Sequence, residues 1–354
     1  LNRSLQERHI QLIALGGAIG VGLFLGSASA IEKAGPGVVL AYIIAGIAIF
    51  FVMRALGELT VEYPVSGSFS AHAYQVLSPL AGYVSGWNYW YVWVVTCMAE
   101  ITAVGVYVHL WLPDLPQWIS CLVALGLMTC ANLFSVKAYG EFEFWFALIK
   151  VVTIIFLIFT GVGMIVFGLG NDGIPVGISN LTEHGGFLPH GIGGVFDTML
   201  MVLFAYVGIE IIGVTAGEAA DPEKNLSAAI DKVLYRILLF YVLALLIIMS
   251  IYPWDQLGHQ GSPFVMVFEK LGITAAGHVI NFVVITAALS SCNSGIYSTG
   301  RMLYNLSLQG KAPKMFSAVS SNKVPYKALG VSVVFMLIGV VLNYFLPATV
   351  FEII

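Results

Sequence analysis

Charged side chains are scarce in this 354-residue sequence: Asp, Glu, Lys and Arg together make up 10%, whereas hydrophobic residues make up 59%. A soluble protein carries about 25% charged residues. So few charges cannot cover a folded surface in water, which excludes an ordinary soluble protein and points to lipid as the solvent. The net charge of −4 is small and no basic stripe is present, so we expect no nucleic-acid partner.

Cysteine and the usual enzyme signatures are also few or missing. The four cysteines lie in apolar segments and none forms a C-x-x-C pair, so the sequence predicts neither a disulfide nor a metal site. No H-E-x-x-H, G-x-S-x-G or paired-carboxylate motif stands out. We therefore expect no catalytic residues, no cofactor and no enzymatic activity. We expect no cleavable signal peptide before the first apolar segment, because residues 1–9 are polar and carry Arg3 and Arg8.

Long apolar stretches are what the sequence has instead. A helix needs about 20 apolar residues to cross a bilayer core. The stretches of that kind are residues 10–31, 37–57, 80–110, 117–136, 143–169, 192–216, 233–252, 272–300 and 328–346, and a tenth begins at Pro347. Only helices satisfy the backbone in lipid at these lengths. We expect an all-α polytopic membrane protein with one transmembrane domain over residues 1–354.

Lys and Arg are distributed unevenly between the two sides of these stretches. Lys33 and Lys270 would lie outside a cell if the N-terminus lies inside, and Lys150 lies within the fifth stretch. The remaining twelve would lie inside: Arg3, Arg8, Arg54, Lys137, Lys224, Lys232, Arg236, Arg301, Lys311, Lys314, Lys323 and Lys327. Positive charge marks the cytoplasmic side, so the bias predicts a cytoplasmic N-terminus.

Two of the stretches are interrupted. The first contains five glycines between Leu15 and Gly26, and the sixth combines Gly208 with Glu210 near mid-membrane. Close helix packing would explain the glycines, and a bond to a neighbouring helix would explain the acid. Together, however, interrupted helices at corresponding places of two halves are typical of inverted-repeat transporters. The halves are residues 10–169 and an incomplete 192–354. Interrupted helices leave backbone N–H groups that can bind a carboxylate and carbonyl groups that can accept from an ammonium group, so the breaks suit a zwitterionic ligand.

Several motifs resemble a known family. They are GAIGVGLF at 17–24, AGPG at 34–37, MRALGE at 53–58, YGEFEFWF at 139–146, GEAADPEK at 217–224, and Asn293-Ser294 followed by Ser298-x-x-Arg301-Met302-Leu303. In this order they resemble the amino acid–polyamine–organocation (APC) superfamily, in its bacterial amino acid permease branch.

The resemblance implies a leucine-transporter-like five-plus-five inverted repeat with broken helices 1 and 6, in a chain that stops near the start of helix 10. It implies a multi-pass protein of the bacterial cytoplasmic (inner) membrane. We expect a secondary active transporter that imports a small, neutral amino acid by proton symport with alternating access. Its partners would be the amino acid substrate, protons and the lipid bilayer. An amino acid exchanger and a non-transporting amino acid sensor remain alternatives.

By the family pattern, the two breaks supply the substrate site. The expected substrate-binding residues are Ile19, Gly20, Val21 and Gly22 of the first break, Phe204, Ala205, Tyr206 and Gly208 of the second, and Met98 for selectivity. In that pattern the first break binds the substrate carboxylate through backbone N–H groups, and carbonyls of the second meet the ammonium group.

Five polar residues within the spans are candidates for coupling or gating. Glu100 lies in the third stretch, where an unpaired charge would be costly, so it is expected to face the cavity or a polar partner. Lys150 lies deep in the fifth stretch, too far from either end to snorkel readily. In proton-coupled relatives a lysine in helix 5 takes the place of a sodium ion. Glu210, Ser291 and Asn293 could complete the cavity, together with the neighbouring Ser290 and Ser294.

Overall fold

The computed structural model describes residues 9–10, 12–13, 16, 19–24, 26–63, 65, 67–134, 136–215, 218, 238–257, 262–272, 275–347 and 350. Within these residues the regular structure is helical and no strand occurs. The longer helices are α4 (Val38–Glu62), α6 (Pro79–His109), α7 (Gln117–Phe134), α8 (Val136–Phe167), α16 (Ala276–Leu308), α17 (Tyr326–Phe345) and a helix at Leu238–Ile251. The shorter ones are α2 (Val21–Phe24), α3 (Gly26–Ala34), α5 (Ser68–Val76), α9 (Asn180–Glu183), α10 (Gly191–Asp197), α11 (Met199–Phe204), α12 (Ile211–Thr215), α14 (Trp254–Leu257) and α15 (Pro263–Lys270), with 3-10 turns η1 (Gly35–Gly37) and η3 (Lys314–Ser317).

In the described part of the chain, six helical runs are long and apolar enough to cross a membrane. One of them, Gly26–Glu62, joins α3 to α4 through η1, where the sequence predicts two separate spans. Two further apolar helices, Gly191–Phe204 and Leu238–Ile251, are shorter. All nine expected stretches are therefore occupied by helix. Most of the tenth lies outside the described residues.

Two helix boundaries differ from the sequence prediction. α8 begins at Val136 rather than residue 143, and α16 continues to Leu308 rather than ending near residue 300. Both extensions carry polar residues, Glu141 and Asn305 among them, which hydropathy alone assigns to loops. Packing against neighbouring helices overrides that signal.

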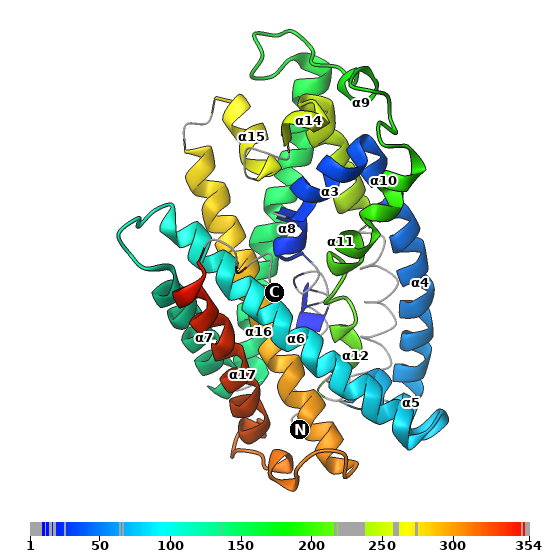
Figure 1. Ribbon diagram of the computed structural model, residues 1–354, viewed down its shortest axis with the longest axis vertical. Helices are drawn as coiled ribbons and strands as arrows, with labels where there is room; N and C mark the ends of the chain where they lie inside the picture. Colours follow the sequence, from blue (N-terminus) through cyan, green and yellow to red (C-terminus); the bar gives the residue numbers. More distant parts are fainter. Residues whose placement is uncertain are drawn as a thin grey trace.

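The sixth span is broken, as expected. α11 ends at Phe204, residues 205–210 form turns, and α12 resumes at Ile211 (Figure 1). Gly208 has φ +113°, a conformation that an L side chain rarely adopts, so glycine is required there. In the first span, Ile19 and Gly20 form a bend immediately before α2.

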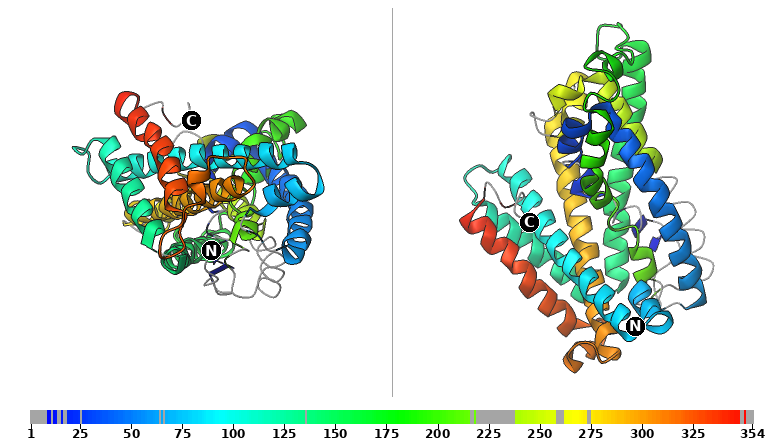
Figure 2. Two further views of the ribbon diagram at one scale, coloured as in Figure 1. Left: turned by 90° about the horizontal axis from the view of Figure 1, so that it is seen from below. Right: turned by 45° about the vertical axis from the view of Figure 1, so that its right-hand side comes forward.

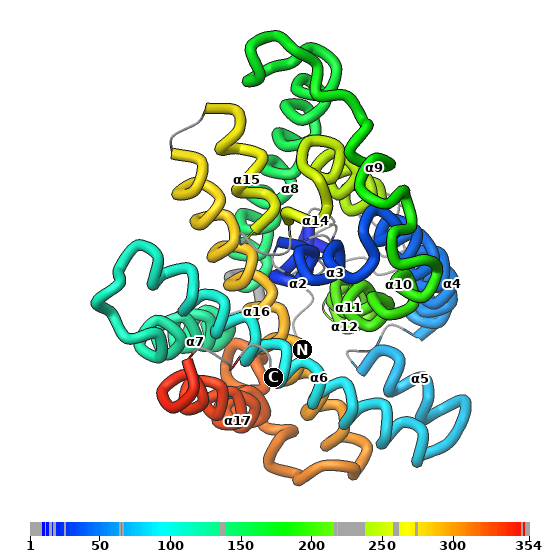
Figure 3. The backbone as a smooth tube through the Cα atoms, turned by 45° about the horizontal axis from the view of Figure 1, so that its top comes forward, coloured from blue at the N-terminus to red at the C-terminus, as the bar shows by residue number. Residues whose placement is uncertain are grey.

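The broken segments lie near the middle of the helix array. Figure 3 shows α2, α3, α11 and α12 near the centre of the view, with α4, α7 and α17 toward its edges. α6 crosses α16 obliquely, and this pair makes the most extensive contact between helices (Figure 2). Gly295 allows the close crossing, because a Cβ added there would lie 2.3 Å from Cys97 Sγ.

The connections between the helices lie at the two ends of the bundle, and the connections at one end differ from those at the other in their Lys and Arg content. α5 and the connection from 309 to 325 lie at one end, and α9 and α14 lie at the other (Figure 1). Lys311, Lys314 and Lys323 fall in the first group, whereas the opposite segment 170–191 has no Lys or Arg. Large apolar side chains such as Phe159 and Val334 are exposed on the outer helices, as lipid contact requires.

Candidate functional site

A narrow cavity lies between the two broken helices, α6 and α16. Its lining residues are Gly20, Gly22, Thr96, Glu100, Phe204, Ala205, Val207 and Ser291. Six of these eight belong to the residues that the sequence singled out. The cavity is thus built from both interrupted spans and from two continuous helices that cross behind them.

The glycines of the first break allow this close assembly. A Cβ added at Gly20 would lie 2.7 Å from Glu100 Oε1 and 3.4 Å from the Ser291 side chain. A Cβ at Gly22 would lie 3.1 Å from Ala205 Cα in the second break. The two interrupted spans therefore pack backbone against backbone at Gly22, where a larger residue would force them apart.

Glu100 projects from α6 into this cavity and is 3% exposed. The Ser291 hydroxyl and the Val21 backbone N–H are hydrogen-bond donors to its carboxyl group. Its Oε2 atom has no hydrogen-bond partner among the described residues. Because an orphaned carboxyl oxygen is costly in a buried site, this atom is available to a proton or to a polar ligand group.

Lys150 lies behind the first break in a fully buried polar chain. Its Nζ donates to the Gly16 carbonyl and, at 2.8 Å, to Ser290 Oγ. Ser290 in turn donates to Glu143 Oε1. Asn293 Nδ2 donates to the other Glu143 oxygen at 3.3 Å. Ser290 thus bridges the lysine of α8 to the glutamate two turns earlier on the same helix.

Asn293 continues this chain toward α7. Asn132 Nδ2 donates to Asn293 Oδ1 at 2.8 Å and to the Asn293 carbonyl at 3.3 Å. The chain therefore runs from the first broken helix through α8 and α16 to α7. Through Lys150 the chain contacts Gly16, four residues before the cavity-lining Gly20.

Glu210 satisfies the backbone of the second break instead of lining the cavity. Its Oε2 accepts the Gly208 backbone N–H at 2.8 Å. Its Oε1 accepts from Tyr89 OH at 3.0 Å and from Trp93 Nε1 at 3.2 Å. Glu210 therefore ties the turn at Gly208 to α6 and stabilises its unusual backbone conformation.

Tyr206 packs away from the cavity into a cluster of aromatic rings. Its hydroxyl donates to the Tyr42 carbonyl at 2.9 Å. Tyr241 OH donates to the Ala205 carbonyl at 2.8 Å, which caps an acceptor freed by the break. The three rings lie with centroids 5.3 to 6.0 Å apart. This cluster fixes the second break against α4 and the helix Leu238–Ile251.

Other expected substrate-binding residues also lie beside the cavity rather than in its wall. Ile19 and Val21 are buried in the core at 0% and 2% exposure. Met98 packs against α17, where Gly339 leaves room for its side chain. Gly208 is engaged by Glu210.

Three residues of the site and its surroundings were not selected as site residues from sequence: Thr96, Val207 and Glu143. Thr96 stands four residues before Glu100, and Glu143 stands seven before Lys150. Both spacings place the pair on one helix face, so helical periodicity around the selected acid and base would have found them. Nothing in the sequence distinguishes Val207 from its apolar neighbours.

A buried ion pair lies farther along α16. Arg301 Nη2 and Nε donate to the Glu218 carboxylate at 3.2 and 3.3 Å. Tyr297 OH donates to the same carboxylate, and the Arg301 guanidinium lies 3.7 Å from the Tyr297 ring centroid. Tyr139 stacks on Tyr297. This cluster joins the chain just beyond α12 to α16 and α8.

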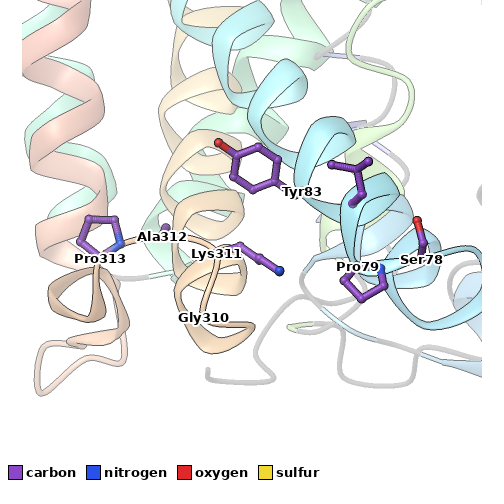
Figure 4. A pocket seen from close by; sticks show the side chains of 8 residues that line it. Ser78, Pro79, Tyr83, Gly310, Lys311, Ala312 and Pro313 are labelled. Carbon is purple, nitrogen blue, oxygen red and sulfur yellow. The ribbon is translucent and has the colours of Figure 1, made fainter.

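A separate surface recess lies where α6 begins and α16 ends (Figure 4). Its walls include Ser78, Pro79, Tyr83 and the segment from Gly310 to Pro313, and Lys311 is its one charged lining residue. None of its lining residues belongs to either broken helix, so the recess is distinct from the cavity at the breaks.

Comparison with known proteins agrees with this geometry. The profile of the family described as amino acid permease matches residues 9–354. The chain is 60% identical to a Bacillus subtilis protein named uncharacterized amino acid permease YtnA and 54% identical to the probable threonine/serine transporter YbxG of the same organism. It is 47% identical to the aromatic amino acid transport protein AroP of Escherichia coli. Each match covers 99% of this chain and 76% of the relative.

Among solved structures, MhsT in complex with L-phenylalanine matches with a TM-score of 0.65 at 14% sequence identity. The match covers 96% of this chain and 80% of MhsT. At this identity the likeness concerns the fold, and it confirms the leucine-transporter-like arrangement with broken helices 1 and 6. The chain belongs to the amino acid permease family.

Proposed function

We propose that this protein imports a small, neutral amino acid by symport with protons, with its N-terminus in the cytoplasm. Family membership makes the chain a multi-pass membrane protein of amino acid transport rather than an enzyme. The proposal adds the coupling ion, the direction and the substrate class. The observation that carries it is the buried contact of Lys150 with the Gly16 carbonyl of the first broken helix.

The cavity supports binding of a zwitterion. Backbone N–H groups near Gly20 and Gly22 can bind the substrate carboxylate, and carbonyls near Phe204 and Val207 can accept from its ammonium group. The apolar wall residues Phe204, Ala205 and Val207 favour an uncharged side chain.

The buried chain at Lys150 supports proton coupling. A protonated Lys150 donates to Gly16 and Ser290, whereas a neutral amine donates more weakly and no longer compensates Glu143. Each protonation state therefore favours a different position of the first broken helix. A ligand or proton shifts a conformational equilibrium by its differential affinity for the two states, so substrate and proton binding become linked through Gly16.

The proposal is tested by uptake of labelled neutral L-amino acids into proteoliposomes with an inward proton gradient and no sodium. We expect accumulation that an uncoupler abolishes. Lys150→Met should lose accumulation while keeping exchange of amino acid across the membrane. Lys137→Met, an exposed lysine on the same helix, is the matched control and should behave like the wild type.

Two results would contradict the proposal in different ways. Uptake that requires amino acid preloaded inside the vesicles, and that ignores the proton gradient, would identify an exchanger. Demonstrated amino acid binding with neither uptake nor exchange would identify a sensor.

A further inference from the structure

Thr96 is the cavity residue that the transport mechanism above leaves without a role. It is 4% exposed, lines the cavity from α6, and stands one helical turn before Glu100. No hydrogen bond joins its hydroxyl to any other described residue. Its oxygen is not among the fully enclosed side-chain atoms that lack a partner, so it borders the cavity and is available to a polar group of a ligand.

Other threonines in the spans of this chain behave differently. Thr102, Thr129 and Thr153 each donate to the carbonyl four residues earlier, at 2.7, 2.6 and 2.9 Å. This back-bonding is the usual way for a helical threonine to satisfy its hydroxyl. Thr96, on the same helix as Thr102, keeps its hydroxyl free for the cavity.

The opposite parts of the wall differ in chemistry. Ser291 of α16 contributes a second hydroxyl, which is a hydrogen-bond donor to the Glu100 carboxyl group. Phe204, Ala205 and Val207 contribute apolar atoms from the second break. A ligand side chain held here therefore meets hydroxyl groups on one side and hydrocarbon on the other.

We infer that Thr96 forms a hydrogen bond with a hydroxyl group on the substrate side chain. The site therefore prefers small hydroxylated amino acids of the serine and threonine class over apolar isosteres. This inference rests on the proposed function, because it assigns the side chain of the same substrate. The Thr96 hydroxyl accepts from or donates to the ligand hydroxyl, and the apolar wall packs against the ligand methyl group. A site built to bond a hydroxyl rejects an analogue without one, since its own polar group is then left unpaired.

The test compares L-threonine with L-valine, which has a methyl group in place of the hydroxyl, in wild type and Thr96→Val. Affinities are measured by thermal stabilisation of the purified full-length protein in detergent, where no gradient exists, and as inhibition constants for uptake. We expect wild type to prefer L-threonine about tenfold, the contribution of one well-formed hydrogen bond. Thr96→Val should reduce the preference to about twofold or less, mainly by weakening L-threonine binding.

Two controls keep the result interpretable if Thr96→Val folds poorly. Thr96→Ser retains the hydroxyl and should retain the preference. In wild type alone, L-allo-threonine presents its hydroxyl in the wrong direction and should bind about as weakly as L-valine.

Several outcomes would overturn the inference. They are an equal affinity of wild type for L-threonine and L-valine, a preference unchanged in Thr96→Val, and a stronger binding of L-lysine through Glu100. The inference and the proposed function fail separately. A threonine preference in detergent without gradient-driven uptake refutes proton coupling alone, whereas gradient-driven uptake without that preference refutes the role of Thr96 alone.

Discussion

Replacing Glu210 by glutamine should destabilise the break in the second repeat although the two side chains have the same shape. The carboxylate accepts from three donors: the Gly208 backbone N–H at 2.8 Å, Tyr89 OH at 3.0 Å and Trp93 Nε1 at 3.2 Å. Backbone and indole N–H groups can only donate. A glutamine has one acceptor oxygen, so whichever way its amide is turned, one of these N–H groups faces an NH₂ group.

The magnitude follows from one buried donor left without an acceptor. Such a loss costs about 1 to 3 kcal/mol, which corresponds to roughly a fivefold to 150-fold change in the folding equilibrium. The assay is reversible unfolding of the detergent-solubilised protein by titration with SDS. The amide would turn its oxygen toward Gly208 and its NH₂ group toward Tyr89, whose hydroxyl can accept. The Trp93 indole N–H, which can only donate, would then face this NH₂ group and lose its acceptor.

A double-mutant cycle isolates this conflict. Trp93→Phe costs stability in the wild type, because it removes a buried hydrogen bond, but in the Glu210→Gln background it also removes the unmatched donor. The double variant should therefore be about 1 kcal/mol more stable than the sum of the single effects. Tyr89→Phe is the matched control and should give no such rescue. Additive effects of Glu210→Gln and Trp93→Phe would refute the reasoning.

Three further predictions concern glycine packing, the polar bridge and a histidine outside the spans. Gly22→Ala should abolish uptake in a membrane-inserted protein, because its Cβ would lie 3.1 Å from Ala205 Cα, whereas Gly126→Ala has open space and should leave uptake unchanged. Ser290→Ala should lower gradient-driven uptake about tenfold while thermal-shift binding stays within about twofold, because it removes the bridge between the buried lysine and glutamate. Burial lowers the pKa of His72 in α5, so its contribution to stability is present above pH 6.5 and is lost as the pH falls below it. Thermal unfolding from about pH 7.5 to 5 should show a smaller loss in His72→Leu.

Hydropathy and glycine placement predicted the fold because they report on the lipid environment directly. Apolar stretches mark where a chain can cross a bilayer, and the glycines around residue 20 and at Gly208 mark where helices are interrupted. Helix ends were less predictable. The polar extensions at Val136 and Leu308 are held by neighbouring helices, and this support is invisible in the sequence of either helix alone.

The residues of the breaks were predictable, but their directions were not. The family resemblance placed the site at residues that include Gly20, Gly22 and Ala205, whereas the rotation of the chain within a turn decides that Tyr206 packs against Tyr42. Thr96 escaped attention because a threonine in a span normally bonds its own helix. The role proposed for Thr96 depends on its hydroxyl having no partner among the described residues, which is a property of the folded structure and not of the residue type.

The most direct test of the account is substrate-induced proton movement in proteoliposomes that enclose a pH-sensitive dye. Adding a transported amino acid outside, with no gradient imposed, should acidify the lumen in wild type and in Lys137→Met but not in Lys150→Met. Amino acid uptake by wild type without acidification, or acidification by Lys150→Met at the wild-type rate, would contradict the coupling of Lys150 to the first broken helix.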